Sequence, residues 1–280
     1  MRRIADYEFV RELGTGNYGT YWLARTPQRL GIDDEFCAVK VLAAQASGDA
    51  FKRMVNELRL FASAKSDCLV TLFDAGHEDG QLFYAARYHP RGSLAEAQGL
   101  SPETIVRAVA DAARGAHALH ELGVAHRDIK PANILLTGST GSAQRAPRGP
   151  GPTAVLADLG LAQRLSPGQT VTGLGPIGTL AFMEPGVARG LPAGRASDIW
   201  GLAATLQSAL TGVDPFPNLP GSTLVHALHH LLNTPPTVTI TDSRWAEIAR
   251  RGMAAERGER WRTALDFAHA LDATLTGAPR

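Results

Sequence analysis

With 280 residues, 44% of them hydrophobic, the chain can fold into one large or two small domains, and disorder over most of its length is excluded. A net charge of +1, without long runs of one sign, argues against nucleic acid or an anionic membrane as main partner. Two cysteines, Cys37 and Cys68, exclude a disulfide scaffold and fit a reducing cytoplasm. Without a secretory signal or a stretch long enough to span a bilayer, we expect a cytoplasmic protein with no membrane segment.

The first part of the chain has the composition of an antiparallel sheet. Aromatic and β-branched residues recur in three runs separated by turn-forming residues, at 7–13, 21–24 and 36–42. A helix with one apolar face is expected over 51–61, with Asp49 as its N-cap. Two further strand candidates follow, at 69–73 and 82–86.

The second part is mostly helical. Apolar residues recur at helical spacing in five segments, at 102–122, 198–210, 222–232, 243–254 and 263–275. The predicted N-caps include Ser101, Ser222 and Thr263. Residues 138–152 are rich in Gly, Pro, Ser and Arg and predict a flexible loop. The order is thus a small β-rich half with one helix, then a larger helical half.

Gly14, Gly16 and Gly19 form a G-x-G-x-x-G pattern, which alone often marks only a tight turn. A dinucleotide fold requires a helix after the third glycine, whereas a strand-like run follows here and favours a glycine-rich hairpin over phosphates. Lys40 lies 21 residues after Gly19, where a neighbouring strand can place its ammonium under the glycine loop. Glu57 on the following helix can pair with it, although a lone lysine or glutamate is more often solvated.

The stretch 126–133 sets a carboxylate, an ammonium and an amide within eight residues of a loop. Asp128 can accept a hydroxyl proton, Lys130 can neutralise a phosphate, and Asn133 can hold a metal ion. A further carboxylate, Asp158, ends a short apolar strand, where an ordinary turn aspartate is the alternative interpretation. Together with Asn133 it would supply the oxygen ligands that suit Mg²⁺.

In this order, the glycine loop, Lys40, Glu57, Asp128, Asn133 and Asp158 resemble the eukaryotic-type protein kinase family, and within it the bacterial Ser/Thr protein kinases. The resemblance runs from about Tyr7 to about Leu275. It implies an α+β, bilobal protein-kinase fold. A small antiparallel-sheet N-lobe with one main helix would cover 1–88, and a larger, mainly helical C-lobe would cover 89–280, with 138–152 as a flexible insert.

The resemblance also implies how ATP would bind. Gly14, Gly16 and Gly19 would cover the phosphates, while Lys40 would hold the α- and β-phosphates and pair with Glu57. The adenine would lie between Ala38 and Leu135, next to a hinge that runs from Arg87 to His89 and is also implied to bind the nucleotide.

The catalytic roles follow from the same resemblance. Asp128 would orient the substrate hydroxyl and accept its proton, Lys130 would steady the transferring phosphoryl group, and Thr179 would contact both. Asn133 and Asp158 would hold Mg²⁺ or Mn²⁺. Asp198 would begin a buried helix that anchors the backbone of the catalytic loop.

Substrate and regulation are implied as well. Lys130, two residues after Asp128, and Gly178-Thr179 are typical of kinases that act on protein Ser/Thr hydroxyls. Arg127 implies control by phosphorylation of the activation loop, since a guanidinium can pair with a phosphothreonine. The candidate sites are Thr170 and Thr172, with self-association for phosphorylation in trans.

The sequence departs from the family pattern at several positions. Tyr21 stands where valine is usual, and Leu159 where phenylalanine is usual. The Ala-Pro-Glu motif reads Glu184-Pro185-Gly186. The glutamate of that motif normally pairs with an arginine that aligns with Arg260, so we expect the pair to be missing unless Glu184 or another acid substitutes.

Two other functions remain as alternatives. A catalytically weak or dead kinase-fold scaffold is supported by Tyr21 and Gly186. A small-molecule kinase of related fold is disfavoured by Gly178-Thr179. One further motif has zinc-site spacing, but a solvated or substrate-docking helix face is the favoured interpretation of its histidines, His226, His229 and His230.

Overall fold

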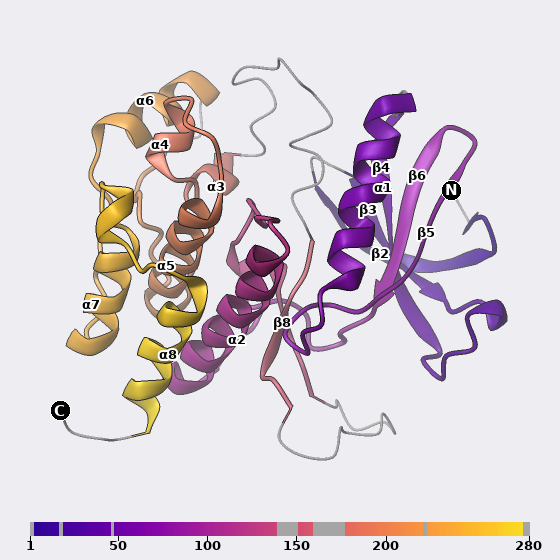
Figure 1. Ribbon diagram of the computed structural model, residues 1–280, viewed down its shortest axis with the longest axis horizontal. Helices are drawn as coiled ribbons and strands as arrows, with labels where there is room; N and C mark the ends of the chain where they lie inside the picture. The colour runs from indigo at the N-terminus through magenta and orange to yellow at the C-terminus, as the bar shows by residue number, and fades with distance from the viewer. Residues whose placement is uncertain are drawn as a thin grey trace.

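The computed structural model describes residues 3–16, 19–45, 48–138, 151–158, 177–220 and 223–276. It shows the expected α+β arrangement, with an antiparallel sheet and one long helix on one side and a helical lobe on the other (Figure 1). We call these the N-lobe and the C-lobe. The exact division after residue 88 stays a prediction. No helix within the described ranges is long and apolar enough to cross a membrane.

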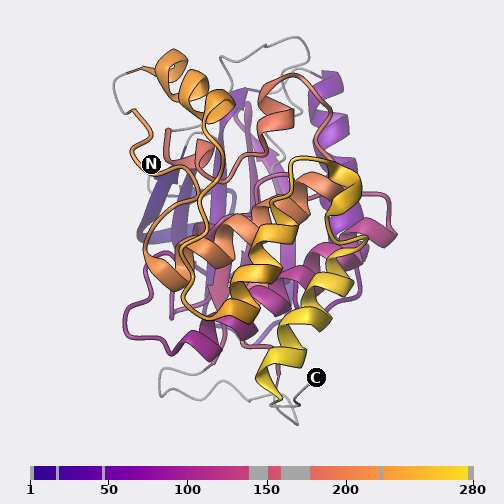
Figure 2. The ribbon, with the colours of Figure 1, turned by 90° about the vertical axis from the view of Figure 1, so that its left-hand side faces the viewer.

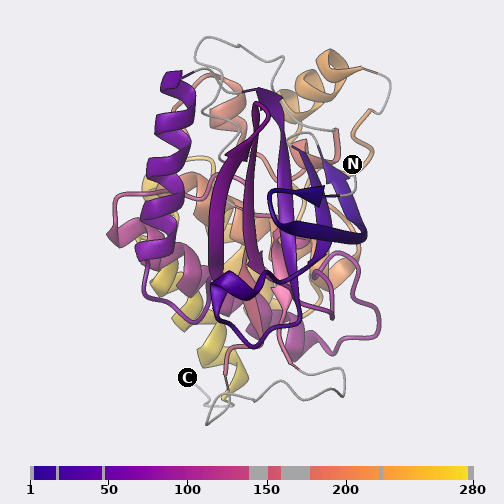
Figure 3. The same cartoon turned by 90° about the vertical axis from the view of Figure 1, so that its right-hand side faces the viewer.

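The N-lobe sheet has six strands in the order β1-β2-β3-β4-β6-β5, each antiparallel to its neighbour. The turn between β5 and β6 has positive φ at both Asp79 and Gly80, as a tight hairpin requires. The helix α1 packs beside the sheet (Figure 3). The bounds are β1 Arg3–Ile4, β2 Tyr7–Gly16, β3 Gly19–Arg25, β4 Phe36–Gln45, α1 Gly48–Ser63, β5 Leu72–Glu78 and β6 Gln81–Arg87, with a 3-10 turn at Gln28–Leu30.

Strand alternation divides the sheet into two faces. Val39 and Val41 of β4 pack with Tyr7 and Phe83 in an outer core. Leu42, two residues on from Lys40, belongs to the main core with α1 and the C-lobe. Because side chains two apart in a strand share a face, Lys40 points toward the C-lobe, where the candidate site lies.

The C-lobe is built around α2, which packs against α5 and α8 (Figure 2). Ser101 caps α2, accepting a hydrogen bond from the backbone N–H of Thr104, and Thr263 and Asp266 form the predicted capping box of α8. The helices are α2 Pro102–Glu121, α3 Ile177–Leu180, α4 Pro185–Ala188, α5 Arg195–Thr211, α6 Leu224–Asn233, α7 Ser243–Gly252 and α8 Ala264–Leu275, with 3-10 turns at Pro131–Asn133 and Arg257–Glu259.

Three local predictions are wrong. Asp49 is not an N-cap, because α1 already begins at Gly48. The cap of α6 is Thr223 rather than Ser222, since the Thr223 hydroxyl accepts from the N–H of His226. The strand expected at 69–73 begins only at Leu72, because the backbone N–H of Val70 bonds instead to Leu156 in the C-lobe.

A short hairpin joins the two lobes at the site. Its strands, β7 Ile134–Leu136 and β8 Ala154–Leu156, pair antiparallel and lie between the lobes in Figure 1. The N–H of Thr137 bonds to the carbonyl of Thr153 and closes the ladder. The predicted insert, 138–152, connects these strands, and 139–150 lie outside the described residues.

Candidate active site

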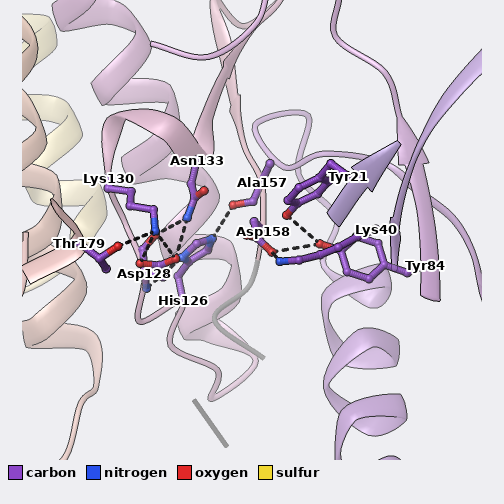
Figure 4. A network of polar contacts seen from close by, with 10 residues as sticks. All are labelled: Tyr21, Lys40, Tyr84, His126, Asp128, Lys130, Asn133, Ala157, Asp158 and Thr179. Carbon is purple, nitrogen blue, oxygen red and sulfur yellow. Dashed lines mark hydrogen bonds and ion pairs between the residues drawn. The ribbon is translucent and has the colours of Figure 1, made fainter. Parts of the chain in front are cut away.

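The predicted catalytic loop, residues 126–133, holds Asp128 in a buried hydrogen-bond network between α2 and β7. Lys130 Nζ donates to both carboxylate oxygens, at 2.8 and 3.1 Å (Figure 4). The side-chain N–H₂ of Asn133 donates to the Asp128 carbonyl at 2.7 Å and to its carboxylate at 3.1 Å. Burial raises the pKa of Asp128, and the Lys130 charge offsets only part of this. Asp128 is therefore a better proton acceptor than an ordinary exposed aspartate.

The loop backbone is fixed from α5 by Asp198, as expected. Its carboxylate is 1% exposed and accepts hydrogen bonds from the backbone N–H groups of His126 and Arg127, each at 2.7 Å. A third bond, to Nε2 of His120 on α2, also measures 2.7 Å. Residue 127 has φ of 69°, an unusual value for a side chain other than glycine. The clamp by Asp198 thus holds a backbone conformation that the chain would rarely adopt alone.

His126 connects this loop to the strand end that carries Asp158. Its Nε2 lies 3.0 Å from the carbonyl oxygen of Ala157, the residue before Asp158. Burial lowers the pKa of His126, which keeps the imidazole neutral, so Nε2–H can donate to that carbonyl. The ring therefore fixes the spacing between the two predicted functional carboxylates.

Thr179 reaches the same network from α3. Its hydroxyl accepts a hydrogen bond from Lys130 Nζ at 3.4 Å. Lys130 is thus shared between Asp128 and Thr179, as Figure 4 shows. The structure thus brings together four predicted site residues of the C-lobe: Asp128, Lys130, Asn133 and Thr179.

The N-lobe sheet contributes Lys40 to the candidate site. Lys40 is 4% exposed, and its Nζ lies 2.5 Å from Oδ1 of Asp158. Burial raises the pKa of Asp158, but Lys40 and the hydroxyls of Tyr21 and Tyr84 outweigh it and hold the pKa below its usual value. Asp158 is therefore ionised. Its backbone has a φ of 58°, an unusual value for a residue other than glycine. The expected pairing of Lys40 with Glu57 stays a prediction, because the Glu57 side chain lies outside the described residues.

The glycine pattern lies at the tip of the β2–β3 hairpin, where Gly16 pairs with Gly19. A Cβ on Gly19 would lie 2.0 Å from the carbonyl oxygen of Val41, and its φ is 143°, so only glycine fits. Gly14 pairs with Tyr21 across the same hairpin.

The residues predicted to bind adenine and to form the hinge keep these roles as predictions. Ala38 shares the face of Lys40 on β4, and Leu135 is half-buried on β7. Arg87, at the end of β6, pairs with Asp34 at 2.9 Å. Burial, assisted by the Arg87 charge, lowers the pKa of His89 to about 4.

Two oxygen atoms of the predicted metal-binding residues are candidates to bind a cation. Asn133 uses its amide nitrogen to bond to Asp128, so its amide oxygen is the atom that can bind a cation. Lys40 and Tyr84 both donate to Oδ1 of Asp158, so within the described residues Oδ2 is the oxygen that could bind a cation. No group of three His, Cys, Asp or Glu side chains suited to a metal occurs in the described ranges. The residues fit a hard cation whose remaining ligands come from phosphate oxygens.

Glu184 substitutes for the glutamate of the family motif, so the Arg260 pair is retained. Its carboxylate lies 2.9 Å from Arg260 Nη1 and accepts from Arg257 at 2.7 and 2.8 Å. The Ser197 hydroxyl donates to it at 2.6 Å. Although burial raises the pKa of Glu184, these partners lower it below its usual value. Gly186 therefore does not leave Arg260 without an acid.

Three contributors were not found from the sequence. The sequence predicts Tyr84 only as part of a strand, whereas its position opposite Lys40 depends on the strand register. Arg257 and His120 become visible only through tertiary contacts. The candidate phosphosites, Thr170 and Thr172, and Leu159 lie outside the described residues.

Comparison with known proteins shows the family to which the chain belongs. Residues 7–269 match the model of the protein kinase domain. The Ser/Thr-protein kinase PknJ of Mycobacterium tuberculosis is 34% identical over 98% of the chain, and PknF of the same species is 31% identical over 98%. The matches cover 46% and 57% of those relatives, so the chain spans about half their length.

A solved structure shows the same fold. The kinase domain of M. tuberculosis PknI superposes with a TM-score of 0.66 at 22% identity, over 97% of this chain and 96% of that one. The curled sheet and the helical lobe are thus those of a bilobal kinase fold. The chain belongs to the protein kinase family and groups with its bacterial Ser/Thr protein kinases.

Proposed function

We propose that the chain transfers the γ-phosphoryl group of ATP to Ser/Thr hydroxyls of proteins. One observation carries the proposal. A buried Asp128, framed by Lys130, Asn133 and Thr179, lies on one side of His126 and Ala157, and the Lys40–Asp158 pair lies on the other (Figure 4). Phosphoryl transfer requires positioning and preset positive charge more than covalent chemistry, and this arrangement offers both.

Asp128 is the proposed acceptor of the substrate proton. Its raised pKa makes it a better base than an exposed aspartate. Lys130 keeps the carboxylate oriented and brings an ammonium beside the path of the transferring group. Thr179 accepts from the same ammonium and so restricts where it can point.

ATP would be enclosed by residues of both lobes. Gly14, Gly16 and Gly19 would let backbone N–H groups approach its phosphates, and Lys40 would neutralise the α- and β-phosphates. Ala38 and Leu135 would bracket the adenine, with Arg87 and His89 at the hinge.

Asn133 and Asp158 would hold Mg²⁺, or Mn²⁺ in its place. The ion supplies neutralisation of the charge on the phosphate oxygens. Among the described residues, the amide oxygen of Asn133 and Oδ2 of Asp158 are the atoms that would face it. Both are hard oxygen donors, the type that these ions prefer.

Regulation and location belong to the same proposal. The backbone N–H of Arg127 is bonded to Asp198, and the Arg127 guanidinium would pair with a phosphothreonine, for which Thr170 and Thr172 are the candidates. Phosphorylation in trans would require two copies to associate transiently. A cytoplasmic location fits the ATP requirement and the two free, buried cysteines, Cys37 and Cys68.

The scaffold alternative has lost one of its two supports. It relied on Tyr21 and Gly186, and Glu184 now supplies the acid that Gly186 lacks. Tyr21 lies beside Lys40 without displacing it from Asp158. Activity is therefore the better-supported interpretation.

The test is transfer of labelled phosphate from ATP to the chain itself and to a Ser/Thr protein acceptor, with Mg²⁺ and with EDTA. Asp128→Asn is the matched control, because it preserves shape and removes the base. Transfer by the wild type alone, mapped to Thr170 or Thr172, would support the proposal. Equal labelling of wild type and D128N would refute it.

A further inference from the structure

Three side chains form a row on the face of the N-lobe sheet that points toward the C-lobe. Tyr21 on β3 is directly opposite Lys40 on β4, and Lys40 is directly opposite Tyr84 on β6. Directly paired residues of antiparallel strands project to the same face and touch. The lysine is therefore flanked by a tyrosine on each side, with Nζ 4.7 Å from the centre of the Tyr21 ring.

The row converges on one oxygen of Asp158. Lys40 Nζ and the Tyr84 hydroxyl both donate to Oδ1, at 2.5 and 3.1 Å. The Tyr21 hydroxyl lies 3.4 Å from that of Tyr84. Since Tyr84 uses its proton on Asp158, Tyr21 is the donor in the second contact. Figure 4 shows the resulting relay from Tyr21 through Tyr84 to Asp158.

The apolar part of Tyr84 does not explain its hydroxyl. Tyr84 is 5% exposed and packs in the main core, a place that phenylalanine fills equally well. A buried hydroxyl destabilises a core unless it finds a partner. Here the partner is the carboxylate predicted to hold the metal ion, and the hydroxyl occupies the oxygen that Lys40 also uses.

From this juxtaposition we infer that Tyr84, assisted by Tyr21, is a positioning residue for the metal-binding carboxylate of Asp158, an inference that rests on the proposed function. The Tyr84 hydroxyl fixes Oδ1 together with Lys40 and thereby presents Oδ2 to the cation. Groups that hydrogen-bond a metal ligand typically contribute 10–100-fold to metal affinity. Tyr84 touches neither substrate nor ATP in this role, so it acts only through Asp158.

The test measures nucleotide binding rather than turnover. The full 280-residue chain is titrated by calorimetry with a non-hydrolysable ATP analogue, once with Mg²⁺ and once with EDTA. The ratio of the two Kd values reports how strongly the metal site contributes. A purely structural role of Tyr84 would change stability, or both Kd values together, but not their ratio.

The variants are Tyr84→Phe, Tyr21→Phe, Asp158→Asn and Tyr7→Phe. Tyr7 is the matched control, because it is 0% exposed and its hydroxyl donates to another carboxylate, Asp74, at 2.7 Å. It belongs to the outer core, away from Asp158. The control thus removes the same atom from the same kind of environment.

We expect Y84F to reduce the Mg²⁺-dependent ratio about tenfold, with the Kd in EDTA unchanged. Y21F should reduce the ratio by a smaller factor, and Y7F should keep the wild-type ratio. D158N should abolish the Mg²⁺ effect. If Y84F does not fold, Y21F decides on the same criterion.

Wild-type ratios in both Y84F and Y21F, beside a lost ratio in D158N, would overturn the inference and leave the proposed function standing. An equal loss in Y7F would also overturn it, because the effect would then be structural. A wild-type chain whose nucleotide binding ignores Mg²⁺ would overturn both the inference and the proposed metal site.

Discussion

Glu184 offers the sharpest test of how the activation segment is held. Its side chain is 2% exposed and lies between two guanidinium groups, that of Arg260, 2% exposed, and that of Arg257, 31% exposed. Glu184→Ala removes the carboxylate and leaves Arg260 buried. Removing one partner of a buried ion pair typically costs about 3–5 kcal/mol.

The structure lowers that figure for this site. Arg260 also donates to the backbone carbonyls of Ala254, Ala196 and Ala255, so it keeps acceptors after the carboxylate is lost. Arg257 is exposed enough to turn toward water. We therefore expect E184A to lower the free energy of unfolding by roughly 2–3 kcal/mol, which in a chain of this size corresponds to a fall in Tm of about 3–5 °C.

A second substitution makes the test specific. A Cβ on Gly186 would lie 3.1 Å from Oε1 of Glu184, so a side chain there competes with the Glu184 carboxylate for space. Gly186→Glu should therefore destabilise the wild type but recover stability in the E184A background, where it restores the acid at the family's usual position. We expect a favourable coupling of about 1 kcal/mol or more in the double-mutant cycle.

The assay is thermal and urea unfolding of the wild type, both single variants and the double variant at pH 7. Additive effects of the two substitutions would refute the reasoning, as would an E184A stability within about 0.5 kcal/mol of the wild type. The pH offers an internal check. The folded pKa of Glu184 lies below its usual value of 4.5, so its contribution is present above pH 4.5 and is lost as the pH falls further.

Three other parts of the structure also give testable predictions. The pKa of His89 in the folded chain is about 4, below its usual 6.5, so between these pH values the unfolded chain binds a proton that the folded chain does not, and stability falls as the pH is lowered from 6.5 to 4. His89→Asn should make stability less dependent on pH, as measured by urea unfolding at pH 7, 5.5 and 4.5. Asp198→Asn weakens the clamp on the catalytic-loop backbone and should lower stability by about 2–3 kcal/mol, measured by unfolding, and reduce kcat more than it raises KM. Replacing 139–150 by a short Gly/Ser turn should leave kcat within about threefold, because β7 and β8 already hold the ends of the segment together; a large loss in the kinase assay would contradict this.

The catalytic loop and the caps were predictable because their signals are local. Asp128, Lys130 and Asn133 lie within six residues, so any fold that keeps this loop brings them together. Ser101 and Thr263 each precede an apolar-periodic segment, and each caps the helix that follows. Short-range hydrogen bonds of this kind depend little on the rest of the chain.

The missed residues depend on pairing between distant segments. Tyr84 became part of the site only through the register that places it opposite Lys40, 44 positions earlier. The displaced start of β5 has the same origin, because Val70 bonds across the lobes to Leu156. Strand propensity identifies an extended segment but does not tell which neighbour it will pair with.

The two departures that raised doubt about activity differ in physical kind. At 184–186 the letters of the motif change while the interaction persists, since the carboxylate has moved two residues and still meets Arg260. Gly186 then provides the space that the moved carboxylate occupies. At Tyr21 the change adds an interaction, a ring over Lys40 and a hydroxyl directed to Tyr84. The residues of a kinase motif matter through the contacts they make. A substituted motif residue therefore weakens the inference of activity only when no other side chain makes the same contact.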